Sequence, residues 1–566
     1  MKQRSASLDF SCEPTLALCS FHIFFLLFFG VLTSARGADV PDNSDTQIER
    51  GKSIYRTGML APDQPLIAHG RADLALQGSA VACVNCHRRS GLGASEGGTL
   101  VLPITGSVLF ETQALGNSRQ SSAQDSGSNT RPAYTEATLL RALQEGVDSA
   151  GRPLDRLMPR YQLTRAEFAP LASYLRTLST IPTPGVTADE IHLATIIVKG
   201  VDPRQRLDLL TLLDTFVKDK NSETRQEPRR AKEAVHSREL MYQGYRKWVL
   251  HVWDLNGEPA SWEAQLNAYY GQQPVFAVLG GLSTGIWSPV HAFCEVREMP
   301  CLFPSVDVPV QSETAFYTLY FSRGVALEAE VLAAHLHKHP VTTSGTVLVQ
   351  VYRNDPYGSA AATAMHTANL DAGMKVIDVA IDPKQTLTKE FWGQILQREK
   401  PSALVLWLNA SDLSDFPNVE PRSPNIERIY LSGSALRDEV PARWGSHLPS
   451  YVIYPYELPS LRPSRFVRMK AWLRSKNIPV SNEILQANTY FTLAVAAEAL
   501  RHLRNNFSRE YFLERIESMA ETMPLVSGFH NVSLGPGQRY AVKGSYVAKY
   551  HPDHGLESDG SEWIVP

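Results

Sequence analysis

Residues 83–87 read Cys-Val-Asn-Cys-His, and no other five positions constrain the front of the chain so strongly. Two thiols with two residues between them can each add to a vinyl group of one porphyrin, and a histidine directly after the second thiol then lies under the iron. We therefore predict that Cys83 and Cys86 tether one haem c covalently and that His87 is the first axial ligand of its iron.

Two other chemistries use paired cysteines, and the surrounding sequence favours neither. A thioredoxin-like redox pair needs a βαβ setting, which the loop around these cysteines lacks. A zinc site needs a second ligand pair, and no Cys or His doublet stands nearby. Covalent haem is the favoured interpretation.

A haem that transfers electrons needs a second, softer axial ligand, and a methionine ligand raises the reduction potential of the iron. Met158, in Leu157-Met158-Pro159, stands just before the last predicted helix of this block and is the predicted ligand. Met59 is the only other methionine between residues 39 and 178, and His69 is the alternative ligand. A methionine packed in the core is the common fate of this residue type.

Residues 47–178 resemble a class I cytochrome c. The resemblance rests on an opening helix with Gly51 and Tyr55, on the Cys-Val-Asn-Cys-His box, on a Met-Pro pair and on a last helix that ends in Tyr174-Leu175. It implies an all-α cytochrome c domain, which we place at residues 39–178.

The resemblance has two further implications. In such domains a proline-containing loop after the box gives a backbone carbonyl to the axial histidine, and Pro103 in Leu102-Pro103-Ile104 is the matching residue. Domains of this class transfer electrons, so redox partner proteins are the implied partners.

The first 38 residues have the pattern of an export signal. Lys2 and Arg4 precede an apolar run at residues 21–32, which is too short to span a bilayer comfortably, and small residues follow it. We predict a signal peptide over residues 1–38 and a periplasmic protein with no membrane span after cleavage. An uncleaved membrane anchor is the alternative; a lipid anchor at Cys19 is disfavoured because this cysteine precedes the apolar run.

A linker at residues 179–189, with two prolines and a glycine, separates the front block from residues 190–566, which have a different sequence pattern. There, β-rich runs alternate with helical patterns, which is typical of parallel sheets covered by helices on both faces. The predicted strands are 191–198, 248–255, 275–282, 300–305, 346–352, 403–408 and 428–431. The predicted helices are 204–217, 262–270, 287–298, 324–337, 359–372 and 388–398. This length exceeds one sheet core, which predicts two lobes.

The order of these elements resembles the type I periplasmic binding proteins, especially the branched-chain amino-acid receptors of transporters. A strand ending in Trp253-Asp254 and its helix precede Val278–Ser283, which runs from strand into helix, and Tyr352–Gly358 then opens a second lobe. The resemblance covers residues 190–550 and implies a two-lobed α/β domain over residues 190–566.

In such a domain, ligand groups lie where strands end and helices begin. Ser283, Thr284 and Ser305 follow strands of the first lobe, and their hydroxyl and N–H groups can hold a carboxylate or another polar head. Tyr357 stands at the matching place of the second lobe, where its ring can cover a ligand. Asp307 is a further candidate, and the expected occupant is a small polar metabolite of open charge. Alternatively, the serines only cap helices or turns and Tyr357 packs inside its lobe.

The remaining cysteines and a histidine group need separate interpretations. Cys294 lies in a predicted helix and Cys301 starts the next strand, which predicts a disulfide; two buried free thiols are the alternative. His335, His337 and His339 cluster at the end of a helix. Spacing of two residues points the first two to different helix faces, so a solvated helix terminus is favoured over a metal site.

The whole chain has 566 residues and a net charge of −3. This balance gives no reason to expect nucleic acid or an anionic membrane as a partner. We expect no catalytic residues, and a protein for electron transfer and binding rather than an enzyme. The predicted function is a periplasmic c-type cytochrome with a solute-binding or docking domain. The alternatives are a haem-containing solute receptor for an ABC transporter or sensor, and an accessory subunit of a quinoprotein dehydrogenase system.

Overall fold

The computed structural model describes residues 44–566, apart from residues 71–72, 97–98, 115–129, 224–245, 342–346, 369–373, 417–425, 440–447, 504–505, 521, 523–526 and 552–554. The predicted signal peptide at residues 1–38 lies outside the described residues. Within the described ranges, no helix is long and apolar enough to cross a membrane.

The first and last helices of the front block pack at a contact that requires a glycine. Its helices are α1 (Ser44–Thr57), α2 (Val84–His87), α3 (Gly106–Phe110), α4 (Glu136–Glu145) and α5 (Arg165–Thr177). A Cβ atom on Gly51 of α1 would meet the Pro170 carbonyl oxygen of α5 at 2.1 Å. One turn later the Tyr55 ring lies 5.4 Å from that of Tyr174. Buried side chains of α1, α4 and α5 form one hydrophobic cluster.

The resemblance implied that the front block is all-α, but the structure also contains short strands there. Short antiparallel ladders pair β1 with β2, β3 with β4 and β9, β5 with β6, and β7 with β8. The strands are β1 (Met59–Ala61), β2 (Gln64–Pro65), β3 (Ile67–His69), β4 (Ala75–Gln77), β5 (Ala94–Glu96), β6 (Thr99–Val101), β7 (Gln113–Ala114), β8 (Thr130–Arg131) and β9 (Arg160–Gln162). The ladders form because connections between the helices fold back on one another, and backbone groups outside helices need partners.

The first of two α/β sheets is entirely parallel. Its strands are β10 (Glu190–Val198), β11 (Lys247–Leu255), β12 (Ala277–Leu279), β13 (Leu282–Ser283), β14 (Cys301–Leu302), β15 (Ser305–Val306) and β16 (Thr318–Leu319). They run in the order β11-β10-β12-β14-β16, while β13 and β15 continue the sheet beside β10. Its helices are α6 (Pro203–Glu223), α8 (Trp262–Gln272) and α9 (Ser288–Val296). Buried residues of α6 and of α8 and α9 belong to two different clusters, so the sheet is covered on both faces.

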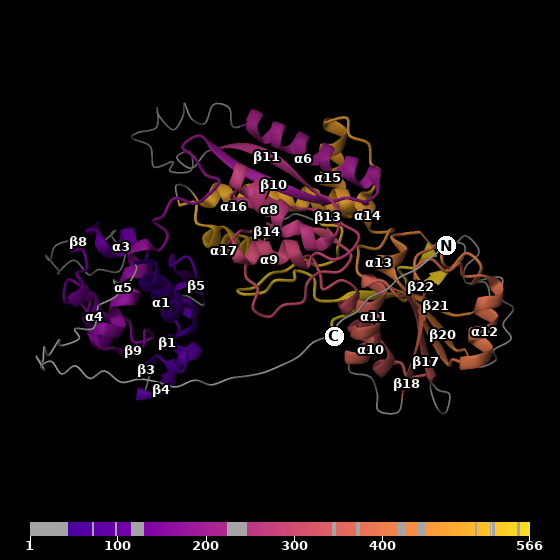
Figure 1. Cartoon of the computed structure of the whole chain (residues 1–566), viewed down its shortest axis with the longest axis horizontal. Coiled ribbons are helices and arrows are strands. Elements are labelled where there is room, and N and C mark those ends of the chain that lie inside the picture. The colour runs from indigo at the N-terminus through magenta and orange to yellow at the C-terminus, as the bar shows by residue number, and fades with distance from the viewer. Residues whose placement is uncertain are drawn as a thin grey trace, which may run out of the picture. The chain divides into compact units, whose positions relative to one another are not determined.

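The second sheet repeats this strand order. Parallel strands run β18-β17-β19-β20-β21, and β22 and β24 add an antiparallel edge. The strands are β17 (Val347–Arg353), β18 (Lys375–Ile381), β19 (Ala403–Trp407), β20 (Arg428–Ser432), β21 (Ser450–Tyr454), β22 (Ser545–His551), β23 (Gly555–Leu556) and β24 (Glu562–Ile564). The helices α10 (Val325–Lys338) and α11 (Pro356–Thr367) lie on one face and α12 (Lys389–Glu399) on the other (Figure 1).

Two long helices near the end of the chain return to the first sheet. After the short helices α13 (Gly433–Leu436), α14 (Arg462–Arg465) and α15 (Val467–Ser475) come α16 (Glu483–Leu503) and α17 (Arg509–Met519). α16 contacts α6, β12 and α17. The chain therefore crosses between the two sheets more than once. The helical layer on the first sheet includes α16, which follows most of the second sheet in the sequence.

Most of the strands predicted from the sequence are confirmed. The predicted strands at 191–198, 248–255, 346–352, 403–408 and 428–431 correspond to β10, β11, β17, β19 and β20. The strand predicted at 275–282 is split into β12 and β13, because Gly280 and Gly281 have φ angles of 64° and 131°. A side chain at Gly281 would also meet the Trp287 ring at 2.9 Å. The strands β18, β21 and β22 and the helix α16 were not predicted.

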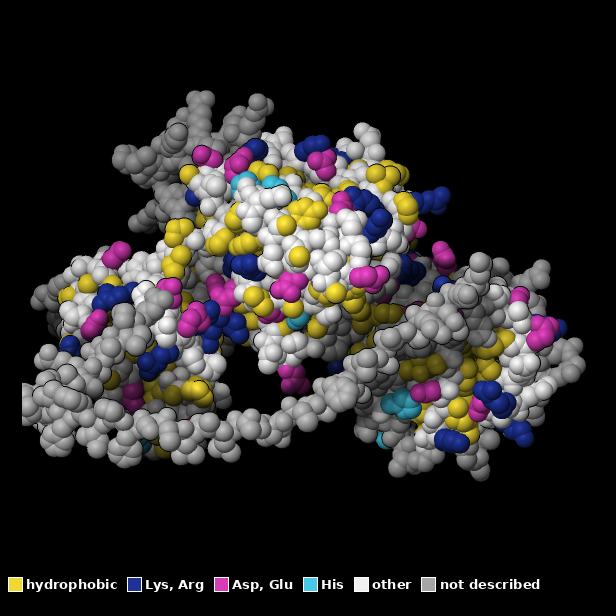
Figure 2. Space-filling view, viewed as in Figure 1, with side chains coloured by type: hydrophobic (Ala, Val, Ile, Leu, Met, Phe, Trp, Pro, Cys, Tyr) yellow, Lys and Arg dark blue, Asp and Glu magenta, His cyan; other side chains and the backbone are white. Residues whose placement is uncertain are grey.

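The charged side chains on the visible face of the described residues carry both signs. Figure 2 shows lysine and arginine interspersed with aspartate and glutamate. This mixture agrees with 55 basic and 58 acidic side chains in the sequence.

Cys294 and Cys301 form a disulfide that joins α9 to β14. Their Cα atoms are 6.3 Å apart, and both residues are buried. The carbonyl of Cys294 accepts a hydrogen bond from the Met299 N–H at 2.9 Å, which turns the chain back towards the sheet. The bridge therefore fixes the start of β14, which leads into the Ser305 region.

Replacing both cysteines, in Cys294→Ala/Cys301→Ala, should lower the free energy of unfolding of the α/β part by about 2 kcal/mol, because the bridge closes a short loop. Urea denaturation followed by tryptophan fluorescence measures this loss. Alkylation of the unfolded wild-type protein before and after reduction is the control. Modification of either cysteine without reduction would contradict the bridge.

Candidate functional site

The Cys-Val-Asn-Cys-His segment folds into one helical turn. The carbonyl of Cys83, directly before α2, accepts hydrogen bonds from the N–H of Cys86 at 3.3 Å and of His87 at 2.9 Å. Residues three and four apart on a helical turn share a face. The two thiols and the imidazole therefore leave the backbone on the same side, and Arg88 ends the turn with a φ of 64°.

A backbone carbonyl orients the imidazole of His87. Its Nδ1 lies 3.0 Å from the carbonyl oxygen of Leu102. A carbonyl only accepts, so Nδ1 carries the proton and Nε2 keeps the lone pair that a metal needs. Burial lowers the pKa of His87, which also favours the neutral ring. The resemblance had pointed to Pro103; the carbonyl is that of the residue before it in the same loop.

The cysteines of the box are two free thiols rather than a disulfide. Cys83 is buried, and this burial raises the pKa of its thiol to about 11, whereas Cys86 is exposed. Two separate thiols at this spacing, followed by an imidazole with a free Nε2, are the donor set of covalently bound haem c. The side chains present therefore fit that group.

The segment that carries Met158 reaches the cysteine box. Met158 packs against the hydrophobic cluster of the front block. Three residues later, in β9, the Tyr161 hydroxyl donates to the Val81 carbonyl at 3.0 Å, just before the box. Burial, together with the nearby Cys83 thiol, raises the pKa of Tyr161. Met158 and Cys83 therefore contact the same hydrophobic cluster of the front block.

The alternative ligand, His69, has one ring nitrogen in a hydrogen bond, while the other lies beside a carboxylate without a hydrogen bond to it. Its Nε2 lies 2.8 Å from the amide nitrogen of Gln162, and its Nδ1 lies 2.9 Å from a carboxylate oxygen of Asp73. Binding iron would require the loss of one of these contacts. Met158 remains the stronger candidate.

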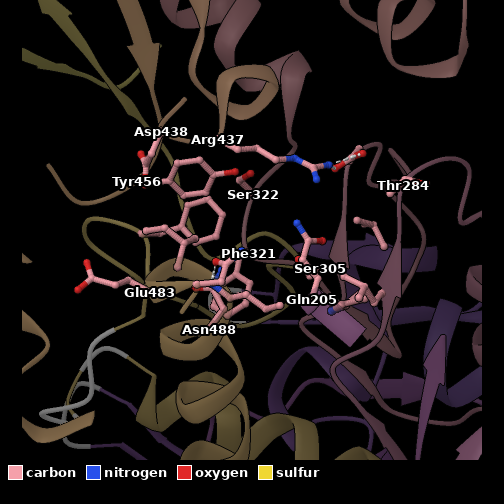
Figure 3. A pocket seen from close by; sticks show the side chains of 18 of the residues that line it. Gln205, Thr284, Ser305, Phe321, Ser322, Arg437, Asp438, Tyr456, Glu483 and Asn488 are labelled. Carbon is pink, nitrogen blue, oxygen red and sulfur yellow. Dashed lines mark hydrogen bonds and ion pairs between the residues drawn. The ribbon is translucent and has the colours of Figure 1, made fainter. Parts of the chain in front are cut away.

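A cavity of about 380 Å³ opens where strands of both sheets end. Ser283, Thr284 and Ser305 line this cavity, and so does Asp307 (Figure 3). They lie in or directly after β13 and β15, the short strands that continue the first sheet beyond the Gly280-Gly281 break. Tyr357 is not among the residues that line it.

Tyr357 instead belongs to a hydrogen-bonded group inside the second α/β unit. Its hydroxyl lies 2.6 Å from the Ser432 Oγ and 2.8 Å from the Ser434 Oγ. Ser432 donates to a carboxylate oxygen of Glu328 at 2.6 Å, and the Ser434 N–H donates to the other oxygen at 3.1 Å. Glu328 is fully buried, and burial raises its pKa to about 7 against the effect of these hydrogen bonds.

Ser283 also serves its own turn. It is the centre of Gly281-Leu282-Ser283-Thr284-Gly285, which fits the Gly-x-Ser-x-Gly pattern of a nucleophile elbow. Its hydroxyl accepts from the Gly285 N–H at 3.3 Å and donates to the Ile286 carbonyl at 3.4 Å, and the side chain is only 2% exposed. Ser283 thus shapes the wall of the cavity, while Thr284 and Ser305 offer more accessible polar groups.

An ion pair crosses the cavity from one sheet to the other. Arg437, directly after α13, donates through Nη2 to the two carboxylate oxygens of Asp307 at 2.6 and 2.8 Å (Figure 3). Burial raises the pKa of Asp307, and the guanidinium offsets this only in part. Arg437 and Asp438 have φ angles of 50° and 71°, so two successive non-glycine residues hold this turn in the left-handed region.

The contribution of the second sheet and of α16 to the cavity was not predicted from the sequence. The charged lining residues there are Arg437, Asp438, Glu439, Arg462 and Glu483, and the apolar ones include Tyr456, Ile484, Leu485 and Phe529. None of them follows a Gly-rich turn, and α16 comes far later in the chain than the first sheet. The β20–α13 junction, with its Ser-Gly-Ser sequence, is the one signal that could have pointed to Arg437.

Comparison with known proteins places one part of the chain in a family. Residues 74–179 match the family model Cytochrome c. The chain therefore contains a cytochrome c domain, and this family implies covalently bound haem c. No curated protein matches the chain significantly.

Several solved structures are similar to about two thirds of the chain. A fatty acid ABC transporter substrate-binding protein from Thermomonospora curvata matches at 18% identity over 68% of this chain and 93% of its own, with a TM-score of 0.45. The leucine-binding protein LivK from Thermotoga maritima matches at 12% identity over 66% and 97%, with a TM-score of 0.45. The branched-chain amino acid transporter substrate-binding protein LivJ from Streptococcus pneumoniae matches at 12% identity over 67% and 100%, with a TM-score of 0.45. What this chain binds has to be argued from its own residues.

The raised pKa of Glu328 predicts a pH dependence of stability. The folded state favours the protonated carboxyl of Glu328. The contribution of this group to the free energy of unfolding is therefore full below about pH 4 and is lost as the pH rises through 7. Glu328→Gln cannot ionise and should lose less stability than the wild type between pH 5 and 8, by on the order of 2 kcal/mol. Urea denaturation at both pH values measures the difference.

Glu330→Gln, on the same helix, is the matched control and should keep the wild-type pH dependence, because Glu330 is a partly exposed partner of Arg323. An equal loss of stability with pH in the wild type and in Glu328→Gln would contradict the assignment.

Proposed function

We propose that this chain is an extracytoplasmic electron-transfer protein that carries one haem c and binds a small metabolite in its α/β part. The observation that carries the first half is the His87 geometry: the Leu102 carbonyl holds Nδ1 and leaves Nε2 for the iron. The expected export signal at residues 1–38 agrees with this setting.

Four side chains would hold the haem. Cys83 and Cys86 would supply the thioether bonds, and His87 and Met158 the axial ligands. When bound, the group supplies one-electron iron chemistry. The protein contributes the orientation of His87 and the apolar packing around Met158, both of which set the reduction potential. A redox partner protein would supply or accept the electron.

Met158→Ala should remove the sulfur-to-iron absorption band of the oxidised protein and lower its reduction potential, because methionine ligation favours reduced iron. Visible spectroscopy and redox titration of the purified haem protein measure both changes. Met59→Ala is the matched control and should leave them as in the wild type.

An unchanged spectrum in Met158→Ala would contradict this ligand. If the band were also lost in His69→Ala, the ligand set would have to be reassigned. Immediate carbon monoxide binding by the reduced wild type would indicate an open iron position and favour the sensor alternative.

The second half of the proposal rests on the two kinds of side chain that line the cavity. Arg437 and Asp307 form a pair of opposite charges, whereas Tyr456, Phe321 and Phe529 form an apolar wall. A carboxylate can replace Asp307 on the guanidinium, and an amino group of the same molecule can then take up the released Asp307. The proposed ligand is therefore a small molecule with a carboxylate, an amino group and an apolar part.

A panel of amino acids, plain carboxylates and plain amines should contain a compound that raises the melting temperature by an amount that grows with its concentration. We expect compounds with both groups to act most strongly. Arg437→Gln should weaken binding by at least about tenfold, because it removes the positive charge that would hold the ligand carboxylate. Calorimetry measures the affinity.

Arg501→Gln, which breaks an exposed ion pair with Glu498, is the control and should bind like the wild type. If no compound bound, or if Arg437→Gln bound normally, the α/β part would be a docking module for a partner protein. This outcome would leave the haem half of the proposal untouched.

A further inference from the structure

A second group of chemically active side chains lies away from both the cysteine box and the cavity. His335 and His339 come from the C-terminal end of α10, and Glu562 comes from β24. One ligand atom of each lies within 4.8 Å of those of the other two. Two distant sequence regions do not meet in this way through local turn geometry alone, because Glu562 is brought in by the antiparallel pairing of β24 with β22.

The two histidines share a helix face. The His339 N–H donates to the His335 carbonyl at 2.8 Å, which continues the helical hydrogen-bond pattern by one residue. Residues four apart are neighbours on a helix surface, and the two ring centres are 4.7 Å apart. His335 and His337 are two residues apart, so they were predicted to point to different faces of the helix. The relevant pair is His335 with His339.

His335 has a buried nitrogen without a hydrogen bond. Its side chain is more than nine-tenths buried, packed against the rings of Tyr430 and Tyr451. Among the described residues its Nδ1 has no hydrogen-bond partner. The nearest carboxylate oxygen, Oε2 of Glu562, is 4.0 Å away, which is too far for a hydrogen bond. An unsatisfied buried polar atom costs stability, so its retention calls for an explanation.

The carboxylate of Glu562 is already divided between two roles. Its Oε1 bonds the Lys338 ammonium, and its Oε2 lies 3.3 Å from Nε2 of His339 and faces Nδ1 of His335. A cation can therefore bind to Oε2 while Lys338 stays bonded to Oε1. Lys338 would then orient the Glu562 carboxylate from outside the coordination sphere. Lys338 and the Arg428 guanidinium, which donates to the His339 carbonyl at 2.6 Å, are the cationic groups that face the cluster.

We propose that His335, His339 and Glu562 bind one divalent transition-metal ion, with zinc as the best-suited element. Imidazole nitrogen and carboxylate oxygen are ligands that zinc accepts in a tetrahedral arrangement, whereas calcium and magnesium prefer oxygen alone. Ligand atoms around a tetrahedral zinc ion lie about 3.3 Å apart, so the exposed His339 ring has to approach His335 by roughly 1 Å. Water completes the coordination.

Such an ion would join two parts of the second α/β unit that are distant in sequence. α10 precedes β17, and β24 is the last strand of the chain. β24 pairs with β22 at the sheet edge, and its Glu562 already bonds Lys338 of α10, so a metal bond would strengthen the attachment of this C-terminal strand to α10. The ion is thus expected to stabilise the fold and not to take part in electron transfer.

Zinc binding should be measured with the purified haem-loaded protein, in which the box cysteines are no longer free ligands. After treatment with a chelator, isothermal titration with zinc chloride should give one site in the wild type that is lost or weakened at least tenfold in His339→Ala and in Glu562→Gln. X-ray absorption at the zinc edge should indicate two imidazole ligands. The haem iron does not disturb this measurement, because it absorbs at a different energy.

His337→Ala, on the same helix turn, is the matched control and should bind zinc like the wild type. Zinc should raise the melting temperature of the wild type and of His337→Ala but not of His339→Ala. His339 is 45% exposed, so its replacement leaves the fold intact. No zinc site in the wild type, or the same site in His339→Ala and Glu562→Gln, would overturn the proposal.

Discussion

Both sheets are built under the constraint that neighbouring parallel strands end at the same edge. Neighbouring parallel strands need crossover connections, most often helices, so the loops after the strands gather on one side of the sheet and those before them on the other. The shared order, with the second strand outside the first, opens a crevice beside the first strand where the connections diverge. The cavity and its Asp307–Arg437 pair lie at these strand ends because of that topology and not because of any local sequence motif.

The helix α10 links the two edges of the second sheet. At the cavity edge Glu328 bonds Ser432 at the end of β20, and at the opposite edge His335 lies near Arg428, where β20 begins. The two positions are about 10 Å apart along the helix. Burial raises the pKa of Glu328 and lowers that of His335 to about 4, so in both cases the neutral form is favoured. One helix thus places two buried ionisable groups at two chemically different ends of the sheet.

Local sequence predicts features that a few neighbouring residues define together. The strands β10 and β19 and the helix α10 follow from hydrophobic periodicity, whereas the helical turn at Cys83–His87 stands where a loop was predicted. Prediction from local sequence fails where a residue or strand far away in the chain decides the local structure. β22 extends the sheet because β21 and β24 pair with it, and the three-stranded ladder of the front block depends on β9 meeting β3. Tyr357 faces Ser432 instead of the cavity because the packing of α11 on the second sheet turns it inward.

The sequence by itself determined the haem-binding chemistry, since two thiols and an imidazole must be close in the chain to act on one porphyrin. It also determined the alternation of strands and helices, because that alternation is written in local hydrophobic patterns. Only the tertiary structure decided that Leu102 holds His87, that Arg437 meets Asp307, and that Glu562 lies near His335. These contacts join residues 15, 130 and more than 200 positions apart, and no short-range pattern encodes the backbone path that brings them together.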